Sequence, residues 1–262
     1  MSNQRVNQNR ASQTEDVYER LRAAILAGQY LPDQKLKIGD LCDQVQGSLG
    51  AVREALSRLL SEGLVLSEAF KGFYVAPVSP ADLIQVTRAR IEVEKLCLAS
   101  SLANGDLEWE GRLVALLHQL LRSSPLDKMG NPVAEWWQLH IAFHDALVSA
   151  CDNSWLLRMH RMLHEQSERY RRLALIVNAD PAKRPPPGRR DTTAEHKQLV
   201  EAALARDAGR AGEIIEAHLL GTTEYLLVQL GDSPLASRSR RADPPEIANE
   251  RQLAGTHHSS VE

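Results

Sequence analysis

The spacing of hydrophobic residues predicts helices along most of the chain. Over residues 17–27 apolar side chains recur every three or four positions, as on one face of an amphipathic helix, and Gly28 ends the run. Ser12 followed by Glu15 matches a capping box, so we expect this helix to begin at residue 12. The polar residues 1–11 before it are predicted to be disordered.

The next stretch predicts a helix-turn-helix. Residues 38–45 show apolar residues at helical spacing, and Gly47 ends the pattern. The run SLGAVREALSRLLSEG then opens with Ser48, a typical N-cap residue, and closes with Gly63, a typical C′ residue. Only a tight turn separates the two helices, as in DNA-binding helix-turn-helix units.

A hairpin follows this unit. The run LVLSEAFKGFYVAP contains two short apolar segments separated by a turn centred on Lys71 and Gly72. Three helices and a hairpin together predict a winged helix-turn-helix domain, which we place at residues 12–78.

From residue 79 onward the pattern is helical only. Ser79 and Pro80 stand in the favoured order of N-cap and first helical position. Helices are expected at residues 80–103, 107–123, 131–151, 154–177, 192–206 and 207–230. The proline-rich stretch 180–191 is predicted to be a loop, and 231–262 a disordered tail. The predicted fold class is therefore mainly α: a winged helix-turn-helix followed by an all-α helical bundle at 79–230.

Composition narrows the possible functions. The chain has 262 residues, of which 43% are hydrophobic, enough for two compact domains. No apolar run approaches the ~20 residues of a membrane span and the N-terminus is not signal-like, so a cytoplasmic protein without a membrane partner is expected. Cys42, Cys97 and Cys151 lack metal or redox spacing and are expected to be buried thiols.

Charge gives no separate indication of DNA binding. The net charge is -3, and residues 1–78 carry nine Lys or Arg against nine Asp or Glu. A DNA-binding face must therefore arise from local placement, at the start of the recognition helix and at the wing tip. The candidate DNA contacts are Ser48, Leu49, Gly50, Arg53, Arg58 and Lys71. The alternative for Arg53 is a surface ion pair with Glu54 or Asp40.

Three runs within residues 15–77 carry a family resemblance. LRAAILAGQYLPDQKL, SLGAVREALSRLLSEGLV and KGFYVAP resemble the winged-helix domain of GntR-family bacterial regulators. The resemblance implies operator DNA as a partner and a homodimer on a palindromic site. One departure is that Leu49, Gly50 and Ala51 stand where Arg followed by Thr or Pro is common. Leu49 is suited to contact a thymine methyl instead.

Histidines at helical spacing form a second candidate site. His140 and His144 are four residues apart and share a helix face, where two imidazoles can chelate one ion. His196 and His218 lie on two later helices that can pack side by side. His160 and His164 have the same spacing as the first pair and are interpreted as packed or solvated. Spacing alone leaves a four-histidine site open.

The second half of the chain is similar to the FadR C-terminal effector domain. Its marks are the run from His140 through Phe143 and His144 to Asn153, the later Glu195 and His196, and the final His218 and Leu219. The resemblance implies a divalent metal ion held by His140, His144, His196 and His218. His140 replaces the usual Asp, and an all-imidazole set suits Zn, Ni or Cu.

Arg90 and Glu94 are the candidate effector contacts, together with Arg172. From the sequence alone, Arg90 and Glu94 form an ordinary exposed i,i+4 ion pair. The resemblance implies instead that the Arg faces a cavity, where a buried guanidinium binds a carboxylate. A small organic acid is therefore the expected effector, with hydroxy acids, dicarboxylates and aromatic acids all open.

These patterns predict a transcriptional regulator, with repression relieved by its effector. We expect no enzyme activity, because no general base of the H-E-x-x-H kind lies between His140 and His144. Two alternatives are a metal-dependent enzyme with an N-terminal docking domain and a DNA-binding protein whose metal site is purely structural.

Overall fold

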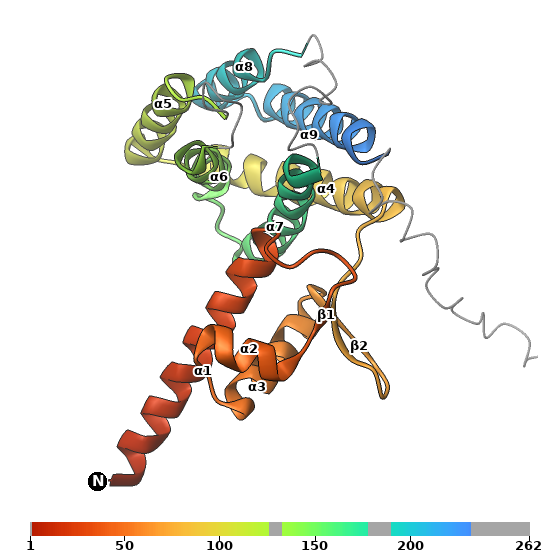
Figure 1. Cartoon of the computed structure of the whole chain (residues 1–262). Helices are drawn as coiled ribbons and strands as arrows, with labels where there is room; N and C mark the ends of the chain where they lie inside the picture. Colours follow the sequence, from red (N-terminus) through yellow and green to blue (C-terminus); the bar gives the residue numbers. More distant parts are fainter. Residues whose placement is uncertain (1, 126–132, 178–189, 232–262) are drawn as a thin grey trace, which may run out of the picture.

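The computed structural model describes residues 2–125, 133–177 and 190–231, arranged in two parts (Figure 1). The N-terminal part comprises α1 (Ser2–Leu26), β1 (Lys35–Leu36), α2 (Ile38–Val45), α3 (Leu49–Ser61), β2 (Val65–Glu68) and β3 (Gly72–Val75). The C-terminal part comprises α4 (Pro80–Asn104), α5 (Leu107–Leu121), α6 (Ala134–Val148), α7 (Ser154–Val177), α8 (Thr192–Leu204) and α9 (Ala208–Gly231). The mainly α fold class with a winged helix and an all-helical second part is confirmed.

The N-terminal part is a small core between α1, α2, α3 and the sheet. Apolar side chains at the predicted helical spacing are buried here, among them Leu21 and Leu56. The Ser48 hydroxyl accepts a hydrogen bond from the Ala51 amide at 3.3 Å, as expected of the N-cap of α3. Gly63 follows α3 with a φ of 70°, a left-handed conformation that glycine adopts without strain. The sequence therefore marked both ends of this helix.

The sheet contains the predicted hairpin and one strand that was not predicted. β2 and β3 pair antiparallel, and β1 adds to the other side of β3 through Lys35 opposite Tyr74 and Leu36 opposite Phe73. A two-residue strand is too short to show a period in the sequence, which is why β1 was missed. The hairpin turn ends at Gly72, whose φ is 100°, and exposes Phe70 fully at its tip.

The first helix begins earlier than predicted. α1 extends back to Ser2, whereas the sequence placed the N-cap at Ser12 and disorder over residues 1–11. Residues 2–11 contain neither glycine nor proline, so nothing in the chain requires the helix to stop at the capping-box pattern. That prediction is wrong for the backbone of residues 2–11.

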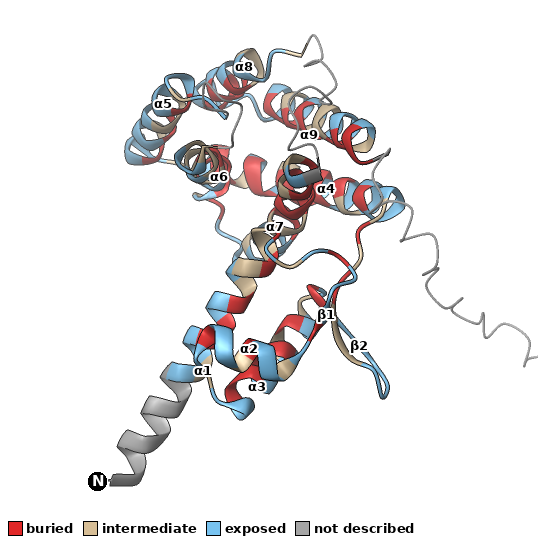
Figure 2. Ribbon diagram, in the orientation of Figure 1, coloured by how far each residue is buried: buried red, intermediate tan, exposed pale blue. Residues whose placement is uncertain are grey.

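The C-terminal part is a bundle in which α4 packs against both α7 and α9 (Figure 1). Buried residues face the interior of the bundle and exposed residues cover its outside (Figure 2). Ser79 caps α4 by accepting from the Asp82 amide at 3.0 Å, with Pro80 behind it as predicted. The Asn153 side chain caps α7 in the same way, accepting from the Trp155 amide at 3.0 Å. Caps thus position the two long helices that surround the histidines.

The expectation of buried cysteines is confirmed for two of the three. Cys97 and Cys151 are buried, but Cys42 is only partly so, because it lies at the edge of the N-terminal core. Residues 180–189 of the predicted loop and 232–262 of the predicted tail lie outside the described residues. Among the described helices, none is long and apolar enough to cross a membrane.

The helix α7 connects the two parts of the molecule. Arg22 of α1 forms ion pairs with Glu62, at 2.9 Å, and with Glu165 of α7. Gln166 donates to the Glu62 carbonyl at 3.2 Å, and Arg169 donates to the Ala76 carbonyl. Three side chains within about one and a half turns of α7 therefore tie this helix to the N-terminal part.

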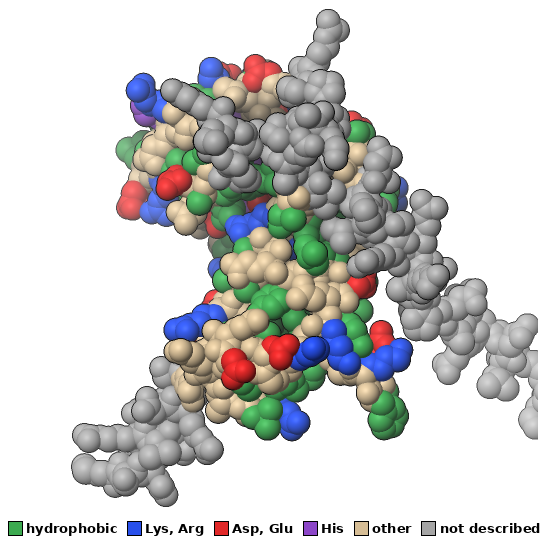
Figure 3. All heavy atoms as spheres, in the orientation of Figure 1, with side chains coloured by type: hydrophobic (Ala, Val, Ile, Leu, Met, Phe, Trp, Pro, Cys, Tyr) green, Lys and Arg blue, Asp and Glu red, His purple; other side chains and the backbone are tan. Residues whose placement is uncertain are grey.

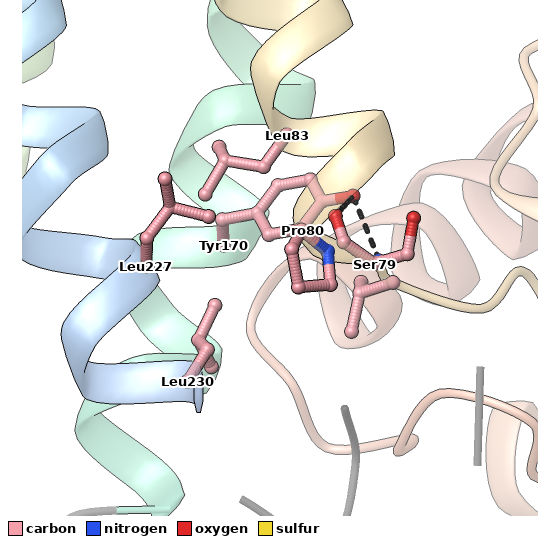
Figure 4. Close-up of a pocket in the computed structure, with 7 residues that line it drawn as sticks. Ser79, Pro80, Leu83, Tyr170, Leu227 and Leu230 are labelled. Carbon is pink, nitrogen blue, oxygen red and sulfur yellow. Dashed lines mark hydrogen bonds between the residues drawn. The ribbon is translucent and has the colours of Figure 1, made fainter. Parts of the chain in front are cut away.

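The linker between the two parts is held by Tyr170 (Figure 4). The Tyr170 hydroxyl bonds to Ser79 and to Asp82 at the start of α4, while its ring is buried. A small, purely apolar hollow beside the ring is completed by Leu227 and Leu230 of α9. With no polar surface, this hollow offers nothing for an organic acid.

Candidate functional site

The structure gathers the four predicted histidines into one cluster. His140 and His144 come from α6, His196 from α8 and His218 from α9, and all four are buried. One nitrogen from each lies within 4.8 Å of the others. The ring centroids of His140 and His144 are 4.6 Å apart, and those of His196 and His218 are 4.8 Å apart. Three helices thus contribute to a set with metal-ligand character.

Burial keeps these imidazoles neutral. Loss of solvent lowers the pKa of His144, His196 and His218 to about 3 each, and that of His140 well below its usual value. A neutral imidazole carries a lone pair, which is the form that binds metal. The Nε2 atoms of His144, His196 and His218 have no hydrogen-bond partner among the described residues. Such unpartnered buried nitrogens fit an ion that they would coordinate together.

An outer layer of charged groups orients the cluster. His218 Nδ1 and Glu195 Oε2 are 2.8 Å apart, so Nδ1 donates and Nε2 keeps its lone pair toward the other histidines. Arg190 in turn donates two hydrogen bonds of 2.6 Å to Glu195. Burial opposes ionisation of Glu195, but hydrogen bonds from His218 and Arg190 lower its pKa to about 2. The carboxylate stays charged and fixes the ring.

The pair Arg90 and Glu94 of α4 lies next to the four-histidine cluster, where Glu94 approaches His144. Arg90 Nε donates to Glu94 Oε2 at 2.8 Å, and their side chains are 2% and 1% exposed. The interpretation as an exposed surface pair is therefore wrong, because α4 is covered by α7 and α9 at this point. Burial opposes the charge of Glu94, but Arg90 and His144 together lower its pKa well below the usual value. Glu94 Oε1 reaches toward His144 Nδ1 at 3.5 Å.

Arg171, and not its neighbour Arg172, faces the histidines. Its Nη1 lies 3.3 Å from His140 Nδ1 and donates to Glu168 at 2.7 Å. Arg172 is the next residue of α7 and is half-buried. Among the described residues, no hydrogen bond or ion pair joins it to the four histidines. Adjacent residues on a helix point about 100° apart, so the sequence located the turn but not the side chain. Sequence reasoning also missed Arg190, whose proline-rich surroundings gave no helical register.

A small hollow with polar side chains lies between α4, α7 and α9. It is lined by side chains of α4, α7 and α9, among them Arg90, Arg171, Thr87, Ser167 and Thr223. Its volume of about 10 Å³ holds about one water molecule. Two guanidinium groups and several hydroxyls around one hollow are suited to an anion.

The predicted DNA contacts differ in exposure and in whether they already pair with a carboxylate of the protein. Ser48, Leu49, Gly50 and Arg53 are exposed at the start of α3. Within the described part of the chain Arg53 forms no ion pair, with Glu54, Asp40 or any other residue. In the view of Figure 3, basic and acidic side chains lie close together on the N-terminal part.

The other two basic candidates already have carboxylate partners. Arg58 forms a two-pronged ion pair with Glu15, at 2.7 and 3.2 Å, and covers the Tyr18 ring. Lys71 is exposed at the wing but lies 2.7 Å from Glu68. Arg53 is therefore the freest base-reading candidate of the three.

A winged helix joined to an all-helical domain with a buried histidine cluster defines a class of two-part DNA-binding regulators. Residues 13–75 match the profile for bacterial regulatory proteins of the gntR family, and residues 85–221 match the FCD domain. The chain belongs to the GntR family and, with its FCD domain, to the FadR subfamily.

Named relatives agree with this assignment. The chain is 40% identical to the HTH-type transcriptional regulator BphR of Paraburkholderia xenovorans, over 80% of this chain and 84% of that protein. It is 33% identical to the HTH-type transcriptional repressor GlaR of Escherichia coli, over 78% and 91% of the two chains. The solved structure of E. coli McbR/YncC has the same fold, with a TM-score of 0.68, 22% identity and coverage of 83% and 98%. The names of BphR and GlaR describe transcriptional regulators, and the chain belongs to this class of transcriptional regulator.

Removing the Glu94 charge should destabilise the helical domain strongly. We expect Glu94→Gln to lower the free energy of unfolding by about 3 kcal/mol, because Arg90 would remain buried without a counter-charge. Glu108→Gln is the matched control: it breaks an exposed i,i+4 pair with Arg112 and should cost about 0.3–0.5 kcal/mol. Urea unfolding followed by circular dichroism measures both. Equal small losses would contradict a buried, charged pair.

Proposed function

We propose that this protein is a ligand-responsive repressor that binds operator DNA as a homodimer. In this proposal a small organic acid, bound near a divalent metal ion in the helical domain, weakens DNA binding. The observation that carries it is the convergence of four buried, neutral histidines with Arg171 and Arg190 behind a winged helix. The name of the relative GlaR, a transcriptional repressor, supports the direction of control.

The proposed metal ligands are His140, His144, His196 and His218. Four imidazoles favour Zn²⁺, with Ni²⁺ and Cu²⁺ as further candidates. When bound, the ion would act as a Lewis acid that attracts a ligand carboxylate. The surrounding chain holds the ring of His218 through Glu195 and stacks Trp136 on His140, with centroids 4.8 Å apart. These contacts keep the nitrogens in place before any ion arrives.

The proposed effector contacts are Arg171 and Arg90, with Glu94 as the fixed partner of Arg90. Both guanidiniums line the polar hollow beside the histidines, so a carboxylate there would meet two cations and several hydroxyls. Arg172, the other predicted contact, lacks this support. The hollow has room for about one water molecule, which is less than an organic acid needs. Binding would therefore displace one of the helices that line it, α4, α7 or α9.

Displacement of α7 is the proposed route from ligand to DNA. One face of α7 carries Arg171, next to the histidines, and another carries Glu165 and Arg169, which bond to the winged helix. A rigid helix shared in this way transmits a shift without a flexible intermediate. In a homodimer the shift would change the distance between the two recognition helices, and with it the affinity for a palindromic operator.

Arg53→Ala should strongly weaken specific DNA binding. Arg53 is exposed at the start of α3 and has no ion-pair partner in the described part of the chain, so its loss should weaken binding to DNA upstream of the protein's own coding sequence about tenfold or more. Electrophoretic retardation against competitor DNA measures the change. Arg112→Ala, which removes an exposed Arg from α5, is the control and should bind as the wild type does. Unchanged retardation by Arg53→Ala at moderate salt would rule out the recognition-helix assignment.

The double substitution His196→Ala with His218→Ala should remove one metal ion per chain. Full-length protein stripped with a chelator and reloaded with Zn²⁺ is analysed by elemental mass spectrometry against the wild type. His118→Ala, which removes an exposed histidine of α5, is the matched control and should retain the wild-type content. Equal zinc in the double variant and the wild type would eliminate the four-histidine site.

The effector is sought by thermal shift of the zinc-loaded protein with a panel of small carboxylates. A ligand that binds the native state raises Tm, and we expect Arg171→Gln to abolish that rise. Arg172→Gln is the matched control from the next position of the same helix and should keep it. The reverse result, loss with Arg172→Gln only, would move the carboxylate site to the face first predicted.

A further inference from the structure

A second set of metal-ligating side chains lies between α6 and α7. Asp145, His160 and His164 each offer one ligand atom within 4.8 Å of the other two. His160 and His164 are each only 3% exposed, so the interpretation as solvated histidines is wrong and packed histidines remain. The fold places this group beside the first cluster, with the rings of His144 and His164 5.8 Å apart.

Packing alone does not satisfy these imidazoles. Three ring nitrogens have no hydrogen-bond partner among the described residues: both nitrogens of His160, and Nε2 of His164. The nearest carboxylate oxygen, Asp145 Oδ1, is 3.5 Å from His160 Nε2, too far for a strong hydrogen bond. Buried polar nitrogens left in this state cost stability. Their arrangement therefore indicates a missing partner.

The separation of these atoms matches two ligands of one ion. Two donors that each lie ~2.1 Å from a tetrahedral ion are about 3.4 Å apart, close to the 3.5 Å between Asp145 Oδ1 and His160 Nε2. The Asp145 side chain is 56% exposed, so an ion can enter from the surface. A solvent molecule can complete the coordination on that side.

We propose that Asp145, His160 and His164 bind a second divalent transition-metal ion of the Zn²⁺ class. Two imidazoles and one carboxylate are a ligand set that such ions accept. The site is separate from the four-histidine cluster, because adjacent residues of α6 serve the two: His144 belongs to the first and Asp145 to the second. An ion here joins the end of α6 to the middle of α7.

The neighbouring cations do not prevent this. Arg90 Nη2 is 3.4 Å from His164 Nδ1, but Glu94 neutralises Arg90 within the same pair. Arg171 is neutralised by Glu168 at 2.7 Å. Glu168 also lies on the same helix face as His164, with Oε1 3.7 Å from His164 Nε2, and its Oε2 has no hydrogen-bond partner among the residues that the structure describes. Each buried positive charge next to the proposed ion thus has its own carboxylate.

Zinc stoichiometry of the full-length chain tests the proposal. Chelator-stripped protein is titrated with Zn²⁺ against a chromophoric chelator, and the wild type should bind two ions. Asp145→Asn and His160→Gln should each leave one tight site and raise the Kd of the other about tenfold or more. Because the Asp145 side chain is exposed, Asp145→Asn keeps the fold and the test stands even if His160→Gln does not fold. His118→Gln is the control for loss of an exposed histidine.

The two metal sites can be distinguished by their variants. The pair His196→Ala and His218→Ala should leave the ion that depends on Asp145. One ion in the wild type, lost with His196 and His218 and unaffected by Asp145→Asn, would overturn this proposal and leave the proposed function standing. One ion lost only with Asp145→Asn would support this site and overturn the four-histidine site. Two ions retained in Asp145→Asn and in His160→Gln would overturn it as well.

Discussion

Burial of ionisable groups is the constraint on which the helical domain depends. Taking an unpaired charge out of water costs several kcal/mol, and this domain encloses Arg90, Glu94, Glu168, Arg171 and a set of histidines. The charges are offset in pairs, Arg90 with Glu94 and Arg171 with Glu168. The four clustered histidines need no counter-charge, because burial lowers their pKa and keeps them neutral. The result is an interior rich in nitrogen lone pairs, in a domain whose remaining core consists of packed apolar side chains.

The same constraint applies to α7, whose polar contacts with both parts of the molecule were not evident from its sequence. Its charged residues alternate between two tasks around the helix. Glu165 and Arg169 bond to the winged helix, and Glu168 and Arg171 bond to one another beside the histidines. A helix with polar contacts on both sides can neither rotate nor slide without breaking one set. Its position is therefore well defined, as a part that links two domains requires.

Much of the fold could be predicted from the sequence because caps and periodicity are local. Ser48 and Ser79 act as N-caps where expected, and apart from the start of α1 the helices end within a few residues of their predicted bounds. The four clustered histidines followed from spacing joined to family resemblance. What failed depends on rotation about a helix axis and on packing from elsewhere in the chain. Arg171 and not Arg172 faces the histidines, and the second histidine pair is buried, because α7 packs against α4 and α9.

The short strand β1 has a consequence for how DNA and ligand communicate. Lys35 and Leu36 pair with β3, so the wing is joined to the segment that follows α1 and cannot bend as a free flap. The end of α1 meets α7, where Gly28 faces Ile176. Binding equilibria that share such a connection are reciprocal. If the ligand loosens the grip on the operator, then operator DNA must by the same free energy lower the affinity for the ligand, and a bound promoter would itself act as an antagonist of the sensor.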